Sequence, residues 1–162
     1  MVMGVSGAGK STLGKALAAR LGWPFQEGDD LHPPANIAKM SAGAPLTDAD
    51  RAPWLTAVGA WIDRCVASGG GGVITCSALK AAYRRTLKQG RPTARFVYLE
   101  GSKAMIAQRL AQRAGHFMPP SLIDSQFADL EPPTAEEERA IVVAADLPIQ
   151  SQVEAVVKAL TQ

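Results

Sequence analysis

Cysteine and histidine are scarce in this sequence, which has two of each among its 162 residues. Neither a disulfide framework nor a Cys/His zinc site can be composed from Cys65, Cys76, His32 and His116. We therefore expect both cysteines to be small buried hydrophobic residues in a reducing compartment. The sequence also lacks an apolar run of about 18 residues and a charged-then-apolar N-terminal segment, so we expect neither membrane contact nor secretion. The expected localisation is cytoplasmic.

Charge of one sign does not dominate either. The 17 Lys and Arg side chains are nearly balanced by 15 Asp and Glu side chains, which leaves a formal net charge of +2. No long block of like charges occurs, so nucleic acid is not an expected partner. Domains commonly have about 150 residues, so the chain is expected to form a single domain over residues 1–162. Apolar residues make up 47% of it, which is enough for a hydrophobic core without disulfide or metal support.

Short apolar runs alternate with longer helical patterns, which is typical of βαβ units that build a parallel sheet between helices. The apolar runs predict strands over Met1–Val5, Trp23–Gln26, Val73–Ser77, Arg95–Glu100 and Ala140–Ala144. The helical patterns predict helices over Lys10–Leu21, Asp48–Ser68, Leu79–Gln89, Lys103–Ala114, Pro120–Leu130 and Ile149–Leu160. Thr47 followed by Asp50 resembles a capping box at the start of the second helix. Residues 28–53 have no strand pattern, and residues 115–120 interrupt two helical patterns. Both segments are expected to be mobile insertions on a rigid sheet.

One motif in the sequence carries specific chemistry. Gly4-Val5-Ser6-Gly7-Ala8-Gly9-Lys10-Ser11 matches G-x-x-x-x-G-K-[ST], the P-loop or Walker A motif, between an expected strand and an expected helix. The backbone N–H groups of such a loop bind phosphates, Lys10 is expected to reach the β- and γ-phosphates of ATP, and the Ser11 hydroxyl is expected to ligate Mg²⁺. The alternative is a glycine-rich turn without a ligand, which the flanking strand and helix argue against. The nucleotide-binding residues predicted in this stretch are Gly4, Ser6, Gly7, Ala8, Gly9, Lys10, Ser11 and Thr12.

Two absences narrow the class of P-loop protein. The apolar run Val73–Ser77 does not end in the magnesium-binding Asp that motor and transport ATPases usually have, and the chain has no Asn-Lys-x-Asp guanine reader. A small-molecule kinase remains, in which mobile segments close over two substrates and exclude water. We therefore predict an α/β protein with a three-layer α/β/α P-loop kinase fold and a five-stranded parallel sheet. Residues 28–53 would form a substrate-binding insertion, and residues 115–120 a mobile lid.

Three further charged residues are candidates for the chemistry. Asp29 follows the expected second strand, at the edge where open α/β sheets bind ligands, and is predicted to accept a proton from an attacking hydroxyl or to hold magnesium through water. A solvated acidic turn is the alternative for Asp29. Arg109 and Arg113 are four residues apart and share a helix face, so they are predicted to bind the nucleotide and to neutralise charge on the transferring phosphoryl group. For both arginines the alternative is a solvated helix face.

Beyond the P-loop, several segments have a distinctive order of residues. They are Gly28-Asp29-Asp30-Leu31-His32-Pro33, Asn36-Ile37-Ala38-Lys39-Met40, Pro45-Leu46-Thr47-Asp48-Ala49-Asp50-Arg51 with Pro53-Trp54-Leu55, Cys76-Ser77-Ala78-Leu79-Lys80 with Tyr83-Arg84, and Arg113-Ala114-Gly115-His116-Phe117. With these segments the chain resembles the gluconate kinases, adenylate-kinase-like P-loop kinases, over nearly its whole length. The resemblance implies phosphorylation of D-gluconate to 6-phosphogluconate with ATP and Mg²⁺, in carbohydrate metabolism. It also implies a homodimer, which no feature of the sequence itself requires.

The resemblance also suggests which residues contact the acceptor. Asp29 would orient or deprotonate the 6-hydroxyl, Arg51 and Arg84 would lie near the sugar acid, and His116 would contact substrate hydroxyls. Guanidinium groups suit a small carboxylate because they can bind it with two parallel hydrogen bonds. The alternatives are a surface position for each arginine and a structural role for His116. His32 would either line the same pocket or stabilise a turn.

Two other functions stay open at this point. A shikimate or nucleotide kinase would use the same phosphate-binding residues with a different acceptor pocket. A nucleotide-binding regulator without turnover is a different class, and the presence of Lys10, Ser11 and Asp29 argues against it. Measuring ADP release with and without candidate acceptors distinguishes the three.

Overall fold

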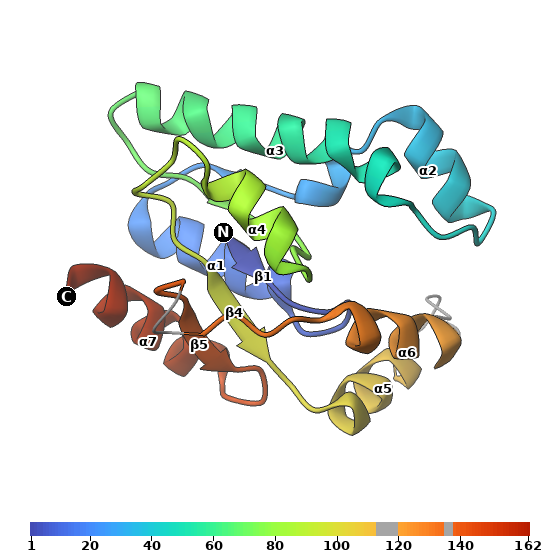
Figure 1. Cartoon of the computed structure of the whole chain (residues 1–162). Coiled ribbons are helices and arrows are strands. Elements are labelled where there is room, and N and C mark those ends of the chain that lie inside the picture. Colours follow the sequence, from blue (N-terminus) through green and yellow to red (C-terminus); the bar gives the residue numbers. More distant parts are fainter. Residues whose placement is uncertain (113–119, 135–137) are drawn as a thin grey trace.

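A computed structural model describes residues 1–112, 120–134 and 138–162. Strands and helices alternate along the chain, as the sequence predicts (Figure 1). The strands are β1 (Val2–Met3), β2 (Phe25–Gln26), β3 (Val73–Ile74), β4 (Val97–Glu100) and β5 (Ile141–Ala144). The α-helices are α1 (Lys10–Leu21), α2 (Pro34–Ser41), α3 (Asp48–Ala67), α4 (Ala81–Lys88), α5 (Lys103–Ala111), α6 (Pro120–Asp129) and α7 (Ile149–Thr161), and a short 3₁₀-helix, η1 (Gly28–Leu31), precedes α2.

The parallel strands form two sheets. β1, β4 and β5 make a three-stranded sheet in the order β1-β4-β5, in which Val2 lies opposite Val97 and Val97 opposite Ile141, and β2 pairs with β3 in the other sheet. A single isolated bridge between Val2 and Thr75 links the two sheets, and the Cys76 N–H donates to the Val2 carbonyl at 3.0 Å. All five predicted strands are present, but each is shorter than predicted, and they form two sheets instead of the single predicted five-stranded sheet. A three-stranded sheet and a two-stranded sheet are distinguished because only one bridge joins β1 to β3.

Successive residues of the central strands face two different hydrophobic cores. Val2 of β1 and Val97 of β4 belong to the core that α1, α5, α6 and α7 complete, whereas Met3 and Tyr98 belong to the core that α3 and α4 complete. Side chains alternate between the two faces of a strand, so these strands are buried on both sides. In Figure 1, α3 and α4 lie above β4, and α7 lies below it. The three layers predicted from the sequence are present.

The long helix α3 begins where its capping signal predicts. The Asp50 N–H donates to the Thr47 hydroxyl at 3.1 Å, and the Asp50 carboxylate accepts from the Thr47 N–H at 2.9 Å. This reciprocal pair satisfies two N–H groups that the helix start would otherwise leave without partners. The helix ends at Ala67, one residue before the predicted end. Its buried face includes Trp54 and Val58, which fixes α3 against the strands.

Residues 28–53 contain two helices that the sequence did not predict, η1 and α2, besides the predicted first turns of α3. Asn36 of α2 is 4% exposed, and its side-chain amide donates to the Asp50 carbonyl at 2.8 Å, so α2 is attached to α3. Most of the predicted lid lies outside the described residues, and α6 begins at Pro120. Within the described part of the chain, no helix has the length and apolar character needed to cross a membrane.

Candidate active site

The loop between β1 and α1 has the backbone that phosphate binding requires. Gly9 is the N-cap of α1 and has a left-handed backbone with φ 103°, and no side chain caps the helix there. At Gly7, where φ is +82°, a Cβ would lie 2.9 Å from a side-chain carbon of Leu110, so the loop packs too closely on α5 for a larger residue. The first N–H groups of α1 are therefore not satisfied by a cap residue and suit an anionic ligand.

Two hydrogen bonds of this loop involve residues that bear on phosphate binding. Lys10, the first residue of α1, donates from Nζ to the Val5 carbonyl at 3.0 Å. The N–H of Ser6 donates to Oε1 of Gln126 at 2.6 Å, which connects the loop to α6. Sequence reasoning missed Gln126, because no local pattern marks a helical glutamine as a partner of a loop 120 residues away. Ser11 is half-buried and Thr12 exposed in the first turn of α1.

A groove of about 430 Å³ opens beside the loop, between Gly7, Ala8, Gly9 and Thr12 on one side and the segment after β5 on the other. Arg109 of α5 spans it, donating to the Ala8 carbonyl at 3.2 Å and to the Ala145 carbonyl at 2.7 Å. The structure therefore places Arg109 beside the P-loop, as predicted from its helix position.

Asp29 lies directly after β2, in η1. The N–H of Gly28 donates to Thr75 Oγ1 at 3.0 Å, and the Thr75 hydroxyl donates to the Glu27 carboxylate, so the start of η1 is fixed to the end of β3. A Cβ on Gly28 would come within 1.8 Å of the Thr75 carbonyl oxygen, so only glycine fits there. The Asp29 side chain is exposed and has no hydrogen-bond partner among the described residues. A fixed main chain thus presents an open carboxylate.

The charges of Asp29 and Lys10 act on the same buried group. Burial raises the pKa of the Cys76 thiol to about 12, and the charge of Asp29 raises it further whereas that of Lys10 lowers it. Both charged groups therefore lie near the thiol just past β3. The P-loop lysine and the candidate proton acceptor come from different parts of the sequence, yet both act on one thiol at the carboxyl edge of the strands.

His32 has a structural environment. It is 8% exposed, its ring is stacked on that of Trp54 with centroids 4.3 Å apart, and Nδ1 lies 3.2 Å from the Asn36 side-chain nitrogen. Burial lowers the pKa of His32, while the charges of Asp29 and Arg51 act on it in opposite directions. Of the two roles considered for His32, the structure favours holding η1 against α3.

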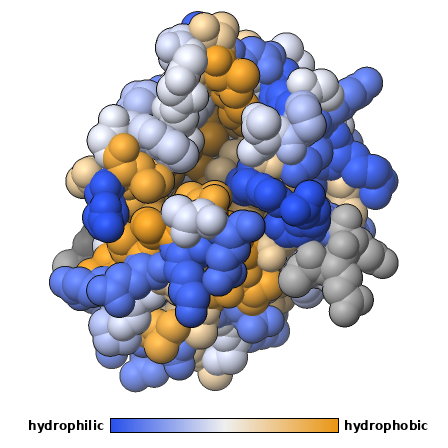
Figure 2. All heavy atoms as spheres, turned by 90° about the vertical axis from the view of Figure 1, so that its left-hand side faces the viewer, coloured by the Kyte–Doolittle hydropathy of each residue, from blue (hydrophilic) through white to orange (hydrophobic). Residues whose placement is uncertain are grey.

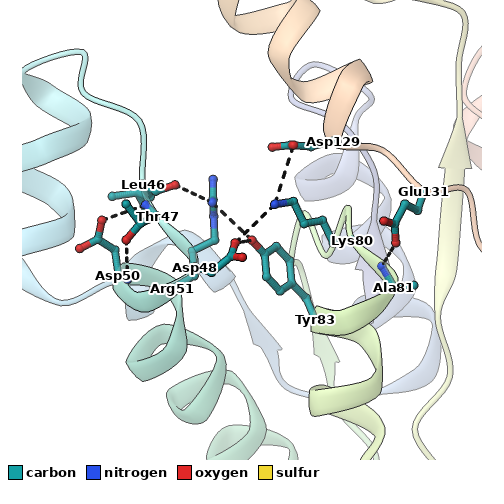
Figure 3. A network of polar contacts seen from close by, with 10 residues as sticks. All are labelled: Leu46, Thr47, Asp48, Asp50, Arg51, Lys80, Ala81, Tyr83, Asp129 and Glu131. Carbon is teal, nitrogen blue, oxygen red and sulfur yellow. Dashed lines mark hydrogen bonds and ion pairs between the residues drawn. The ribbon is translucent and has the colours of Figure 1, made fainter.

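Arg51 belongs to a polar network at the N-terminal ends of α3 and α4 (Figure 3). Its guanidinium group donates to the Leu46 carbonyl at 2.7 Å and to the Tyr83 hydroxyl at 3.4 Å, and it lies 5.8 Å from the centre of the Tyr83 ring. The Tyr83 hydroxyl in turn donates to the carboxylate of Asp48. Arg51 is half-buried, so its guanidinium group is oriented by its neighbours without being enclosed.

Lys80 completes this network from the residue before α4. Its ammonium nitrogen lies 3.4 Å from the carboxylate of Asp48 and 3.9 Å from that of Asp129 in α6. Sequence reasoning named Arg51 alone as a site residue in this region. Lys80 and Tyr83 stand in the segments that carry the family resemblance, which is the one signal that could have found them.

Arg84 does not reach this cluster, which corrects the expectation that it lies near the acceptor. It is 2% exposed, and its guanidinium group makes two 2.7 Å hydrogen bonds to the Glu138 carboxylate and two 3.0 Å bonds to the Ala78 and Leu79 carbonyls. A buried guanidinium group needs such partners to offset its desolvation. In this arrangement Arg84 fixes the start of α4 to the segment before β5. Arg113 and His116, the remaining predicted site residues, lie outside the described residues.

A second cavity lies away from these residues. It has a volume of about 380 Å³ and is lined by Trp23, Trp61, Cys65 and the glycines after α3, among others. These segments lie at the left of Figure 1, and Figure 2 shows hydrophobic side chains across the middle of that face. The cavity contains none of the predicted site residues, so we place the candidate active site at the P-loop.

Comparison with known proteins agrees with this geometry. The family model for shikimate kinase matches residues 6–160. A gluconokinase from Gluconobacter oxydans is 56% identical over 137 residues, which make up 85% of this chain and 77% of that protein. The chain belongs to the gluconokinase family. The thermosensitive gluconokinase of Escherichia coli is 46% identical over 138 residues, or 85% of this chain and 74% of the relative.

Solved structures of the family confirm the fold. A gluconokinase from Sinorhizobium meliloti is 47% identical and superposes with a TM-score of 0.87, covering 99% of this chain and 89% of that one. A shikimate kinase from Aquifex aeolicus is 16% identical and superposes with a TM-score of 0.60, covering 99% of this chain and 94% of that one. At this low identity the likeness shows only that the fold is shared. The predicted α/β P-loop kinase fold and the resemblance to gluconate kinases are thus confirmed.

Proposed function

We propose that this chain catalyses the ATP-dependent phosphorylation of D-gluconate to 6-phospho-D-gluconate, with ADP as the other product. The observation that carries the proposal is a P-loop and an open Asp29 carboxylate at one edge of the strands, in a chain 56% identical to a named gluconokinase. A phosphate-binding loop and a nearby group that can accept a proton are what phosphoryl transfer to a hydroxyl requires.

On the nucleotide side, the P-loop residues from Gly4 to Thr12 named above bind the phosphates of ATP. Lys10 compensates negative charge on the β- and γ-phosphates, and Arg109 does so from α5. Arg113 is assigned the same role. The hydroxyl of Ser11 and, through water, the carboxylate of Asp29 suit Mg²⁺, which prefers oxygen ligands. A bound Mg²⁺ ion would supply further positive charge to the phosphates.

On the acceptor side, the 6-hydroxyl oxygen of gluconate attacks the γ-phosphorus, and the bond to the β-γ bridging oxygen breaks. The hydroxyl proton passes to the Asp29 carboxylate, which also orients the hydroxyl for an in-line attack. Arg51 binds the sugar acid and His116 its hydroxyls. Arg84 is left out of this assignment because its donors are already bonded to Glu138 and to two carbonyls.

The finer architecture belongs to the same proposal. The bridge between Val2 and Thr75 supports a continuous five-stranded arrangement in the order β2-β3-β1-β4-β5. A lid over residues 115–120 would close over both substrates and exclude water, as phosphoryl transfer to a hydroxyl in preference to water demands. A homodimer in the cytoplasm stays a prediction.

An ADP-release assay across gluconate, sorbitol, glucose, shikimate and nucleoside monophosphates tests the function directly. We expect gluconate to be the preferred acceptor, with kcat/KM about a thousandfold above that of the neutral sorbitol, because a site built for a carboxylate is left with unpaired charge by a neutral analogue. The Lys10→Ala variant controls for contaminating kinases. Preference for shikimate or for a nucleoside monophosphate would overturn the assignment, and ADP release independent of any acceptor would indicate an ATPase.

A further inference from the structure

Two groups that can donate hydrogen bonds contact the Asp48 carboxylate at the ends of α3 and α4, and a third such group contacts one of the two (Figure 3). The Tyr83 hydroxyl donates to Asp48, and the Lys80 ammonium group lies 3.4 Å from the same carboxylate. Arg51 donates to the Tyr83 hydroxyl at 3.4 Å. The centre of the Tyr83 ring lies 5.8 Å from the Arg51 guanidinium carbon and 5.7 Å from the Lys80 nitrogen, so both cations lie near this ring.

Asp48 itself is loosely held in this cluster. Its side chain is 71% exposed, whereas Tyr83 as a whole is 9% exposed. The tyrosine is thus built into the fold, and the carboxylate that it binds can rotate into water. A binding site with fixed donors and an exchangeable carboxylate is suited to a second carboxylate from solution.

The ionisation of the cluster favours an anion as well. The Tyr83 hydrogen bond and Lys80 lower the pKa of Asp48, and the neighbouring Tyr83 and Asp129 raise the pKa of Lys80. Burial raises the pKa of Tyr83, so its hydroxyl stays protonated and able to donate near neutral pH. Two further carboxylates lie near these residues: that of Asp129, 3.9 Å from Lys80, and that of Glu131, which accepts a hydrogen bond from the N–H of Ala81 at 2.5 Å.

The cluster lies next to the residues that act on the hydroxyl end of the acceptor. Arg51 is one turn before Trp54, whose indole N–H donates to the Gly28 carbonyl at 2.8 Å, adjacent to Asp29. The charges of both Asp29 and Arg51 act on the ring of His32, so both groups lie near this ring. A chain-like acceptor could thus have its hydroxyl end at Asp29 and its other end at Arg51.

We propose that Tyr83, Lys80 and Arg51 together form the subsite for the carboxylate of the sugar acid, and that Asp48 occupies this subsite when no acid is bound. The inference rests on the proposed function and deepens it. It attributes the preference for an acidic acceptor to Tyr83, Lys80 and Arg51, whereas the sequence analysis attributed it to Arg51 and Arg84. On binding, the substrate carboxylate accepts the hydrogen bonds that Asp48 accepts in the free protein, and Asp48 turns to solvent.

Steady-state kinetics of Tyr83→Phe and Lys80→Met tests the subsite. Each variant loses one donor to the carboxylate, so we expect the KM for gluconate to rise about tenfold or more, with kcat and the KM for ATP nearly unchanged. The kcat/KM for sorbitol should stay as it is, so the gluconate-to-sorbitol ratio should fall with the KM change. Lys103→Met is the matched control, because Lys103 forms an exposed ion pair with Asp124 on α5 and α6.

Asp48→Asn tests the exchange of carboxylates. If Asp48 competes with the substrate, the isosteric amide should lower the KM for gluconate, whereas a merely structural Asp48 predicts an unchanged or higher KM together with a lower melting temperature. An unchanged gluconate-to-sorbitol ratio in folded Tyr83→Phe and Lys80→Met overturns the inference, even where the unmodified protein prefers gluconate. A protein that does not phosphorylate gluconate overturns the proposed function instead.

Discussion

The side-chain oxygen of Gln126 accepts a hydrogen bond from the main-chain N–H of Ser6 at 2.6 Å. Ser6 lies in the middle of the P-loop, where main-chain N–H groups bind phosphate oxygens. In the free protein a helical side chain from α6 therefore occupies a donor that the nucleotide would use. We expect bound ATP to compete with Gln126 for this N–H, which would couple the position of α6 to the occupancy of the loop.

Gln126→Ala should strengthen nucleotide binding, because it removes a group that competes with phosphate for the Ser6 N–H. The net value of a hydrogen bond, about 1 kcal/mol, corresponds to a roughly fivefold lower Kd for a non-hydrolysable ATP analogue. Isothermal titration measures this Kd, with Ser125→Ala, an exposed neighbour on the same helix, as the control. A higher Kd in Gln126→Ala would show that the glutamine organises the loop for binding.

Lys10→Ala should reduce kcat/KM by about a hundredfold or more, because it removes a positive charge that stabilises the transferring phosphoryl group. The melting temperature should change little, since the contact that the side chain makes with the Val5 carbonyl is local. Coupled ADP release and thermal denaturation check the two parts. Near-normal turnover of the folded variant contradicts the kinase assignment.

Asp29→Asn should lower kcat by about a hundredfold or more with little change in ATP binding, because the amide has the size of the carboxylate but cannot accept the hydroxyl proton. Asp30→Asn is the matched control, since Asp30 is also exposed in η1. A rise in the gluconate KM at constant kcat would instead make Asp29 a binding group.

Glu138→Gln should destabilise the fold, because it leaves the buried guanidinium group of Arg84 with a neutral partner. Removing one member of a buried ion pair costs about 3 kcal/mol or more, and the 25% exposure of the Glu138 side chain places the expected loss toward the lower end. Urea denaturation measures the change in the free energy of unfolding. The gluconate-to-sorbitol ratio should stay constant in the folded variant, and a collapse of that ratio without loss of stability would return Arg84 to the acceptor site.

Acidification should destabilise the protein through His32. Burial lowers its pKa below the ordinary value of 6.5, so the unfolded chain binds this proton more readily than the folded protein does. The contribution of His32 to the free energy of unfolding is therefore full above pH 6.5 and falls as the pH drops from there to the pKa of the folded state.

Denaturation of the unmodified protein and of His32→Gln between about pH 7.5 and 5.5 measures how the free energy of unfolding changes with pH in each. The variant should be less stable at all pH values, since it loses the ring stacked on Trp54, but its stability should depend less on pH. The comparison with the variant is needed because burial also lowers the pKa of the Met1 amino group to about 6. If the free energy of unfolding changes with pH equally in both proteins, His32 does not control this pH dependence.

Local signals in the sequence determined the P-loop, the bounds of α1 and the start of α3. The P-loop begins directly after β1 and ends in Gly9 and Lys10 at the start of α1, and Thr47 with Asp50 closes a capping box. The information for these features therefore lies within a few neighbouring residues. The position of Asp29 also followed from the sequence, because the residue after a parallel strand must lie at the edge of the sheet.

Only the tertiary structure decided which charged side chains meet. Arg84 and Tyr83 are adjacent in the sequence, yet Arg84 is buried against Glu138, 54 residues away, while Tyr83 joins Asp48, 35 residues away. The gap between Ser6 and Gln126 is larger still. A sequence pattern shows that a helix has charged residues. A buried charge needs a partner that offsets its desolvation, and the packing of distant segments decides which residue that partner is. That choice depends on the packing of the whole chain, so local reasoning could not show that Arg84 pairs with Glu138 while Tyr83 and Lys80 contact Asp48.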